Sequence, residues 1–261
     1  MPVDPLLVRA RGLWETLAAV PVSFAPSGGL TVVTSPGSGL CPPSWAGIVM
    51  LGDAAIATVP TAGAAQVVRR VLAAVPAGSL TRPEAIRAVL PVTEVLGPAT
   101  LAYVARDGFR PAPAHHAVEQ LAPGHRDLRE LVRSAGPEDA DESGMEEVTS
   151  PVFVVREGTD VVAAAGYRAW PAATAHVCVL TAPQWRGRRL ARQTASAAVA
   201  HALTAGLLPQ WRARPPASRQ VARALGFREL GSQLSVRLDP DALTETTPPG
   251  GPTPGYRGRD S

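Results

Sequence analysis

The stretch from Ser150 to Gly206 constrains the fold more than any other part of the chain. Three apolar, strand-like runs follow one another at residues 150–158, 160–170 and 175–183. The turns between them are short, so the three runs are predicted to be antiparallel neighbours in one sheet. An alanine-rich helical run follows at residues 188–206, and its small side chains allow it to lie close on that sheet. The order predicts an α+β fold with a strand–loop–helix unit at residues 177–205.

Flanking runs extend this pattern on both sides. Residues 123–136 predict a helix that ends at Gly136, and residues 137–147 predict an acidic loop or a short helix. Downstream, a strand is predicted at 207–214, a helix with Ser218 in its first turn at 216–227, and a last strand at 231–239. We therefore expect a domain at residues 114–238 with a mixed, mostly antiparallel sheet flanked by helices.

The first 113 residues indicate structure but offer no chemical motif. Residues 45–60 predict short buried strands broken at Gly52. Helices are predicted at 62–76 and at 79–91, the second with Thr81 as its N-cap, and a strand over 99–109. These elements form an N-terminal α/β extension at 1–113. It either shapes an acceptor site, caps the sheet, or pairs two copies of the chain into a homodimer.

Composition excludes several classes of function. The net charge is only +3 and no long basic block occurs, so we expect no nucleic-acid partner. All 25 positive side chains are arginines in an alanine- and proline-rich chain, which indicates codon bias and makes their number uninformative. Apolar runs are far shorter than the ~20 residues of a membrane span, so no membrane partner is expected.

The two ends of the chain and its cysteines complete these expectations. Cys41 and Cys178 lie far apart and form neither a disulfide framework nor a metal-binding pattern. The N-terminus has no basic start followed by a long apolar core, so a cytoplasmic protein is expected. Residues 239–261 are rich in proline, glycine and threonine and are predicted to form a disordered tail.

The segment "QWRGRR", Gln184 to Arg189, lies where the third strand gives way to the alanine-rich helix. The first turn of a helix leaves about four N–H groups unpaired, and these groups attract anions together with the helix dipole. A glycine here lets phosphate oxygens approach the backbone, and Arg186, Arg188 and Arg189 add positive charge. The segment predicts a pyrophosphate site. The plainer alternative is a turn glycine among solvated arginines.

Two other nucleotide motifs do not fit this segment. A Walker loop ends in Gly-Lys-Ser/Thr, and the chain has no lysine. A Rossmann fingerprint needs more glycines and parallel strands.

From Ala114 to Leu238 the chain resembles the GNAT acetyltransferase superfamily. "QWRGRR" matches the family pattern Q/R-x-x-G-x-G/A at Gln184 and Gly187, and residues 206–227 match the following strand and helix, which close on a Gly-Phe pair. The resemblance implies acetyl-CoA as cosubstrate and no metal. It also implies that a splayed strand binds the pantetheine arm through its backbone. The residues implied to bind acetyl-CoA are Val177, Cys178, Val179, Leu180, Gln184, Arg186, Gly187, Arg188, Arg189, Leu190, Ala191 and Ser218.

The sequence departs from the family pattern at three places. Arg189 replaces the second glycine of the loop, and if that position requires positive φ the arginine costs roughly 1 kcal/mol or more. Pro215 or Pro216 replaces an asparagine common in the family, so a contact to CoA is either lost or made by Ser218. Ala222 stands where many members place the tyrosine that protonates the departing thiolate.

Transfer of an acetyl group to an amine requires a base, and the acidic segment offers Glu142, Glu146 and Glu147. Glu142 is preferred, although a carboxylate run is often only a solvated surface. His176 also titrates near neutrality unless it is structural. Cys178 has no evident base partner and is better explained as a small buried residue.

We therefore expect an N-acetyltransferase that acts on a small-molecule amine or a protein amine by direct attack on the thioester. The alternative is a GNAT-fold module that binds CoA or regulates a partner after losing catalysis.

Overall fold

A computed structural model describes residues 4–26 and 28–245, and within them one sheet carries every strand. In spatial order the strands are β1 (Gly29–Thr34), β3 (Ala54–Val59), β2 (Ala46–Leu51), β10 (Arg228–Leu238), β4 (Val92–Tyr103), β9 (Leu208–Ala213), β8 (Thr174–Thr181), β7 (Asp160–Trp170), β6 (Val152–Glu157) and β5 (Glu119–Leu121). The pairs β1–β3 and β8–β9 are parallel and the other neighbours are antiparallel. The predicted α+β class with a mixed, mostly antiparallel sheet is confirmed.

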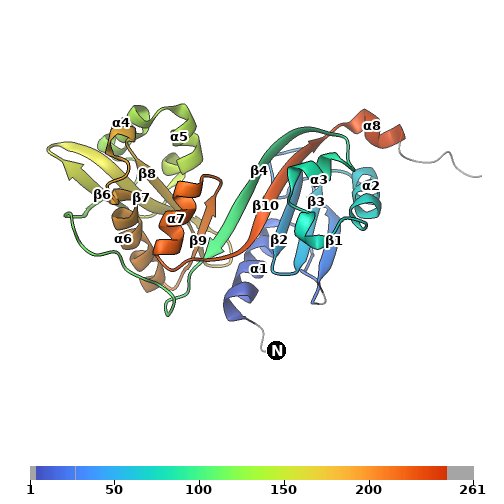
Figure 1. Cartoon of the computed structure of the whole chain (residues 1–261), viewed down its shortest axis with the longest axis horizontal. Coiled ribbons are helices and arrows are strands. Elements are labelled where there is room, and N and C mark those ends of the chain that lie inside the picture. Colours follow the sequence, from blue (N-terminus) through green and yellow to red (C-terminus); the bar gives the residue numbers. More distant parts are fainter. Residues whose placement is uncertain (1–3, 27, 246–261) are drawn as a thin grey trace, which may run out of the picture.

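Helices cover both faces of the sheet (Figure 1). They are α1 (Pro5–Leu17), α2 (Ala62–Leu72), α3 (Pro83–Arg87), α4 (Arg126–Ala135), α5 (Pro137–Ser143), α6 (Leu190–Thr204), α7 (Pro216–Ala224) and α8 (Pro240–Glu245). In β3, Ile56 packs with the α1 cluster and Ala57 with the α2 cluster. In β7, Ala164 packs with α4 and Ala165 with α6. Successive residues of a strand point to opposite faces, so the alternation places one helix on each side.

The alanine face of α6 lies directly on the sheet, as predicted. Ala195, Ala198 and Val199 are fully buried and pack against β7, β8 and β9 residues in one cluster. Small side chains permit this close approach of helix and strands. The start of α6 is therefore held at a fixed position beside the end of β8.

Two long strands join the N-terminal part of the sheet to the rest. Figure 1 shows β4 and β10 side by side between the two groups of helices. β4 lies between β10 and β9, and β10, the last strand in the sequence, also pairs with β2. Gly231 in β10 lies so close to β2 that a Cβ there would stand 1.8 Å from the carbonyl oxygen of Met50. The domain boundary between residues 113 and 114 stays a prediction, and the sheet is continuous across it.

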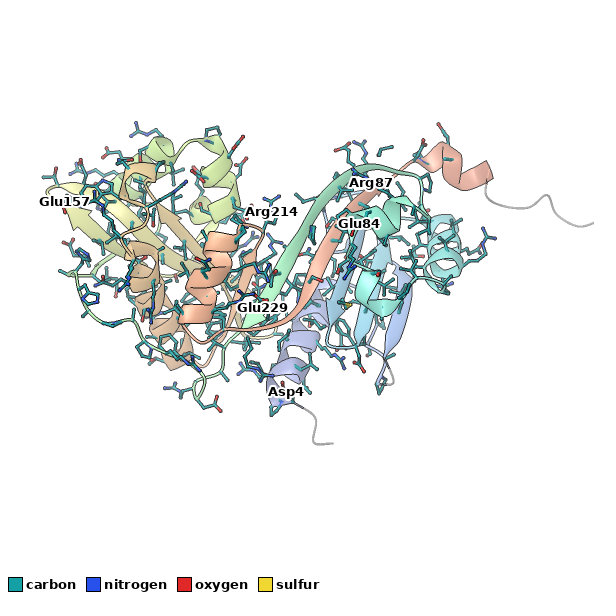
Figure 2. The ribbon with its side chains drawn as sticks, viewed as in Figure 1. Asp4, Glu84, Arg87, Glu157, Arg214 and Glu229 are labelled. Carbon is teal, nitrogen blue, oxygen red and sulfur yellow. The ribbon has the colours of Figure 1, made fainter. Side chains whose placement is uncertain are left out.

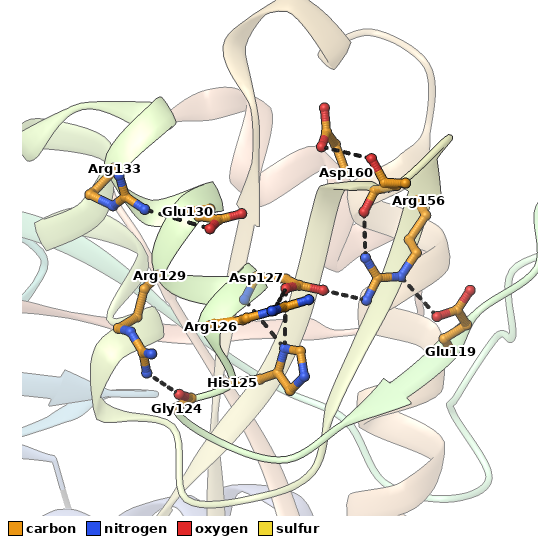
Figure 3. Close-up of polar contacts among 11 residues, drawn as sticks. Glu119, Gly124, His125, Arg126, Asp127, Arg129, Glu130, Arg133, Arg156 and Asp160 are labelled. Atoms are coloured by element: carbon orange, nitrogen blue, oxygen red, sulfur yellow. Dashed lines mark hydrogen bonds and ion pairs between the residues drawn. The ribbon is translucent and has the colours of Figure 1, made fainter.

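An arginine fixes the far edge of the sheet to α4 (Figure 3). Arg156 of β6 donates to Glu119 of β5 at 2.9 Å and to Asp127 of α4 at 2.6 Å. The hydrogen bond from Arg156 lowers the pKa of Asp127. This contact ties α4 to the sheet, and α4 in turn packs against α5, the acidic segment of the sequence.

Most predicted elements are confirmed, and three details differ. Thr81 does not cap the helix predicted at 79–91: α3 begins only at Pro83, and the Thr81 hydroxyl instead bonds Ser232 at 2.6 Å. The predicted tail begins with the short helix α8, and residues 246–261 lie outside the described part of the chain. No sequence pattern predicts α1, β1 or the short edge strand β5, and the strand predicted over 99–109 is β4, which begins at Val92 and ends at Tyr103.

Candidate functional site

Strands β8 and β9 part from each other at the centre of the sheet. They pair only from Thr174–Leu208 to His176–Gln210. Beyond this point β9 stays paired to β4 up to Ala213, whereas β8 continues along β7 to Thr181. The second edge of β8 is therefore open from Val177 onward, as the family resemblance implied for residues 177–180.

A cleft of about 560 Å³ lies along this open edge. Its walls are β8, the turn before α6, the end of β9 with α7, and α5. Of the residues predicted to bind CoA, those that line it are Val177, Val179, Leu180, Arg186, Gly187, Arg189, Leu190, Ala191 and Ser218.

The turn before α6 opens its backbone toward the cleft. Gly187 has φ +79°, and Arg189, at the N-cap of α6, has φ +64° in the left-handed region. No side chain caps the helix, and Gln193 is the first residue whose N–H bonds back, to Arg189 at 3.3 Å. Arg189 therefore adopts the positive φ whose cost the sequence analysis described for this position. The amides of the first turn remain available to an anion.

Two further donors in the cleft lack partners. Within the described residues, the Thr181 hydroxyl and the Nε of Arg192 are buried without a hydrogen bond, although Arg192 donates through another nitrogen to the Ala224 carbonyl at 3.2 Å. Both residues line the cleft. Buried polar groups are nearly always hydrogen-bonded, and a ligand in the cleft would give these two atoms partners, although Arg11 Nε and Gln210 Nε2 lack partners outside the cleft as well. The sequence prediction included neither residue.

Three residues predicted to bind CoA do not line the cleft. Gln184 is exposed, and the Arg188 guanidinium lies 4.4 Å from the centre of the Trp185 ring. Cys178 is buried on the other face of β8 in the α4 cluster, and burial raises its pKa to about 12. That pKa agrees with a small core residue and not with a nucleophile. A contact through the Cys178 backbone stays a prediction.

The α7 side of the cleft lacks the tyrosine of the family pattern. Ala222 is 2% exposed and packs into the α6 cluster. Ser218 lines the cleft, and its oxygen accepts a hydrogen bond from Trp211 at 2.9 Å. The Ser218 hydroxyl proton therefore remains free to bond a ligand.

A side pocket of about 110 Å³ adjoins the cleft and is built by both parts of the chain. The two cavities share Glu142, Ser143, Val177 and Arg212. β4 and β10 form the opposite wall. From these two strands the lining residues are Leu96, Gly97, Ala99, Gln233 and Ser235. Strand β4 of the N-terminal extension thus lines this pocket, and the role of the extension in shaping an acceptor site stays a prediction.

Glu142 lies at the junction of the two cavities. It is half-buried and pairs with Arg214, which lies between α7 and β4 in Figure 2. The other acidic candidates, Glu146 and Glu147, are exposed and line neither cavity, and Glu147 pairs with Arg168. The placement favours Glu142 among the three carboxylates, and its role as base stays a prediction.

His176 lines the side pocket but is held as a neutral ring. Burial, and next the charge of Arg212, lower its pKa to about 3. Its Nδ1 lies 2.5 Å from the Gln210 side-chain oxygen, and the ring stacks on Trp170 at 4.2 Å. A histidine with this pKa holds a proton poorly at neutral pH, which fits a structural role better than that of a base.

An aromatic cluster from α1 and β4 supports this region from behind. Trp14 donates to the Tyr103 hydroxyl at 2.6 Å, and its ring meets Trp170 edge-on at 6.2 Å. Trp14 and Tyr103 are fully buried. No sequence pattern connects these residues to the site, because their contacts depend on the strand order.

Two features of other protein classes are absent from the described residues. No helix there is long and apolar enough to cross a membrane. No group of three His, Cys, Asp or Glu side chains in the same residues is placed to hold a metal ion.

Part of the chain that forms the cleft matches a known family. Residues 152–232 match the family model of the GNAT acetyltransferases, so the predicted resemblance to this superfamily is confirmed. A GNAT-family protein from Novosphingobium aromaticivorans is 22% identical over 56% of this chain and 65% of its own, with a TM-score of 0.44. A GCN5-related N-acetyltransferase from Kribbella flavida is 16% identical over 56% and 60%, with a TM-score of 0.45. The chain thus covers less than two thirds of either structure. No curated protein matches.

Proposed function

We propose that the protein is an acetyl-CoA-dependent N-acetyltransferase that transfers the acetyl group directly to an amine. The main support is the turn before α6, where Gly187 and Arg189 adopt left-handed conformations beside uncapped amides that face the cleft. Few ligands other than a phosphate group need this combination of amides and arginines.

The rest of the cleft fits the other parts of acetyl-CoA. The diphosphate binds the amides of residues 187–191 and the guanidinium groups of Arg189 and Arg192. The pantetheine arm lies along the open edge of β8, where backbone groups and the Thr181 hydroxyl bond its amides. The thioester then lies near Val177, beside the side pocket that holds the amine.

The chemistry requires two protons to leave the ammonium nitrogen, one before the attack and one from the tetrahedral intermediate, and one proton to reach the thiolate. Glu142 takes a proton from the ammonium group, and the free amine attacks the thioester carbonyl. Backbone N–H groups of β8 stabilise the oxyanion. The carbon–sulfur bond breaks, and the thiolate leaves as CoA after protonation. The nitrogen of the tetrahedral intermediate loses its second proton, and Ser218 or water relays that proton to the thiolate, because Ala222 cannot.

Thermal unfolding with acetyl-CoA, beside a thiol-release assay on a panel of amines, tests the proposal. Acetyl-CoA at 100 times its dissociation constant should stabilise the protein by about 2.7 kcal/mol. At least one amine should release CoA. No stabilisation by acetyl-CoA and no thiol release would refute the proposal.

The buried Ala222 favours a second candidate function, a CoA-binding or regulatory module without catalysis. It predicts the same stabilisation by acetyl-CoA but no thiol release with any amine. The paired measurement therefore separates the two.

A further inference from the structure

The side pocket contains an arginine without an acidic partner. Arg214 pairs with Glu142, and Arg186 pairs with Asp139. Arg212, in the wall that the two cavities share, makes no ion pair within the described residues. Its contacts are a long hydrogen bond of 3.5 Å to the Gln233 side-chain oxygen and a position 5.7 Å from the centre of the Trp170 ring.

The surroundings of Arg212 hold it in place without neutralising it. The Gln233 amide is fixed by a hydrogen bond to the Leu40 carbonyl at 2.5 Å, and Trp170 is fixed by its stacking on His176. Neighbouring protein removes part of the hydration of Arg212 and lowers its pKa, and Glu142 acts in the opposite direction. Arg212 is exposed at the wall that the two cavities share, so its positioned guanidinium is open to a bidentate anion that enters them.

From these contacts we infer that the acceptor is a small amino acid-like molecule whose carboxylate binds Arg212 while its ammonium group faces Glu142. The inference rests on the proposed function and specifies its acceptor. Arg212 is then a specificity-determining residue and Glu142 the neighbouring base.

Charge and size favour a carboxylate over other anions. The ionised lining side chains are Asp141, Glu142, Arg212 and Arg214, whose charges balance, and one of the two arginines is already paired. A single carboxylate charge gives Arg212 an ion-pair partner, whereas a phosphate would bring a second negative charge toward Asp141 and Glu142. The pocket, at about 110 Å³, has room for a small polar head group.

The test compares amino acids with the amines that lack only the carboxylate. Acetyl transfer is measured on all twenty amino acids and β-alanine, with ethylamine, ethanolamine and phenethylamine as partners of alanine, serine and phenylalanine. A lysine-containing peptide blocked at both ends serves as a protein-like acceptor. At least one amino carboxylate should react with a kcat/KM about 100-fold above the best carboxylate-free amine.

Arg212→Gln should lower kcat/KM on that amino carboxylate by about 10- to 100-fold and on the carboxylate-free amine by less than threefold. The amine also corrects for any change in acetyl-CoA affinity, since Arg212 lines both cavities. Arg212→Lys keeps the charge but loses the bidentate guanidinium, so its kcat/KM on the amino carboxylate should lie between those of wild type and Arg212→Gln. Arg168→Gln is the matched control, because it removes the same charge outside the pocket and should retain the preference.

Three results would overturn the inference. In the first, amino acids and the matching carboxylate-free amines react at equal rates. In the second, the blocked peptide is the one acceptor that reacts. In the third, no amino carboxylate reacts. Acetyl-CoA binding is measured in parallel in each case. If the protein still binds acetyl-CoA, the CoA site is intact, and only the acceptor assignment or the catalytic function fails. Loss of preference in Arg168→Gln as well as Arg212→Gln would also contradict it.

Discussion

The two parts of the chain differ in the number of functional motifs that their sequences carry, yet both line one candidate site. Residues 114–238 carry the turn, the open strand and the acidic helix that define the cleft. Residues 1–113 carry no motif, but β4 from this part inserts beside β9 and forms a wall of the side pocket. In our account the GNAT-like part binds the cosubstrate, and the N-terminal part helps to select the acceptor.

The largest effect is expected from a substitution that disrupts the pairing of β10 with β2, which joins the two parts. Gly231→Ala places a methyl group 1.8 Å from the Met50 carbonyl and forces β10 away from β2. We expect the free energy of unfolding to fall by about 3 kcal/mol in denaturant titrations. Gly63→Ala, in α2 with open space around its Cβ position, should not destabilise the protein. Equal stability of the Gly231 variant and wild type would mean that the two parts are not joined as described.

Chemistry in the GNAT-like part is tested next. Glu142→Gln removes the proposed base and should lower kcat about 100-fold. Acetyl-CoA affinity, measured by calorimetry, should change less than twofold. The control variant Glu146→Gln, which changes a nearby exposed carboxylate, should keep the kcat of the wild type. A normal rate for Glu142→Gln would remove this residue from the mechanism.

A smaller effect tests the contribution of the N-terminal part. Leu96→Ala shortens an exposed side chain, 42% accessible, at the side pocket. The kcat/KM for the acceptor should fall about fivefold through lost apolar contact, with no change in the KM for acetyl-CoA. Val89→Ala, at 40% accessible but outside the pocket, should behave as wild type. An effect on acetyl-CoA alone would contradict the division of roles.

The last prediction concerns His176, which lines the side pocket between the two parts. Its pKa is about 3 in the folded protein and near 6.5 when unfolded, so the unfolded state binds its proton first as pH falls. The free energy of unfolding should decrease below pH 6.5, and His176→Asn should reduce that slope. The ring resonances of His176 should not titrate between pH 5 and 8 by NMR. A midpoint near 6.5 would restore His176 as a candidate base.

The sequence predicted the cleft better than the pocket for a physical reason. A strand, a turn with Gly187 and a helix are adjacent in the chain, so their relation follows from local rules. Arg212 faces Leu96 and Gln233 only because β9, β4 and β10 are neighbours in the sheet. Strand order across a sheet depends on long-range pairing, which periodicity does not encode. The same holds for Trp14 and Tyr103, whose contact spans 89 residues.

Site details divide in the same way. The left-handed Arg189 was anticipated from the missing glycine, since the turn geometry constrains that position directly. Thr181 and Arg192 were missed, because an unpartnered buried atom is visible only in three dimensions. Gln184 matches the pattern in sequence, and Arg188 adds positive charge to the same segment, but neither residue lines the cleft.

Calorimetric titration of acetyl-CoA into wild type, Gly187→Glu and Gly206→Glu tests the central claim most directly. The two glycines flank α6 at φ +79° and +76°, and both have open space at the Cβ position. Wild type and Gly206→Glu should bind acetyl-CoA with similar affinity, whereas Gly187→Glu should bind about 100-fold more weakly or not at all, because it sets a carboxylate against the diphosphate. Equal binding by all three folded proteins would contradict the proposed site.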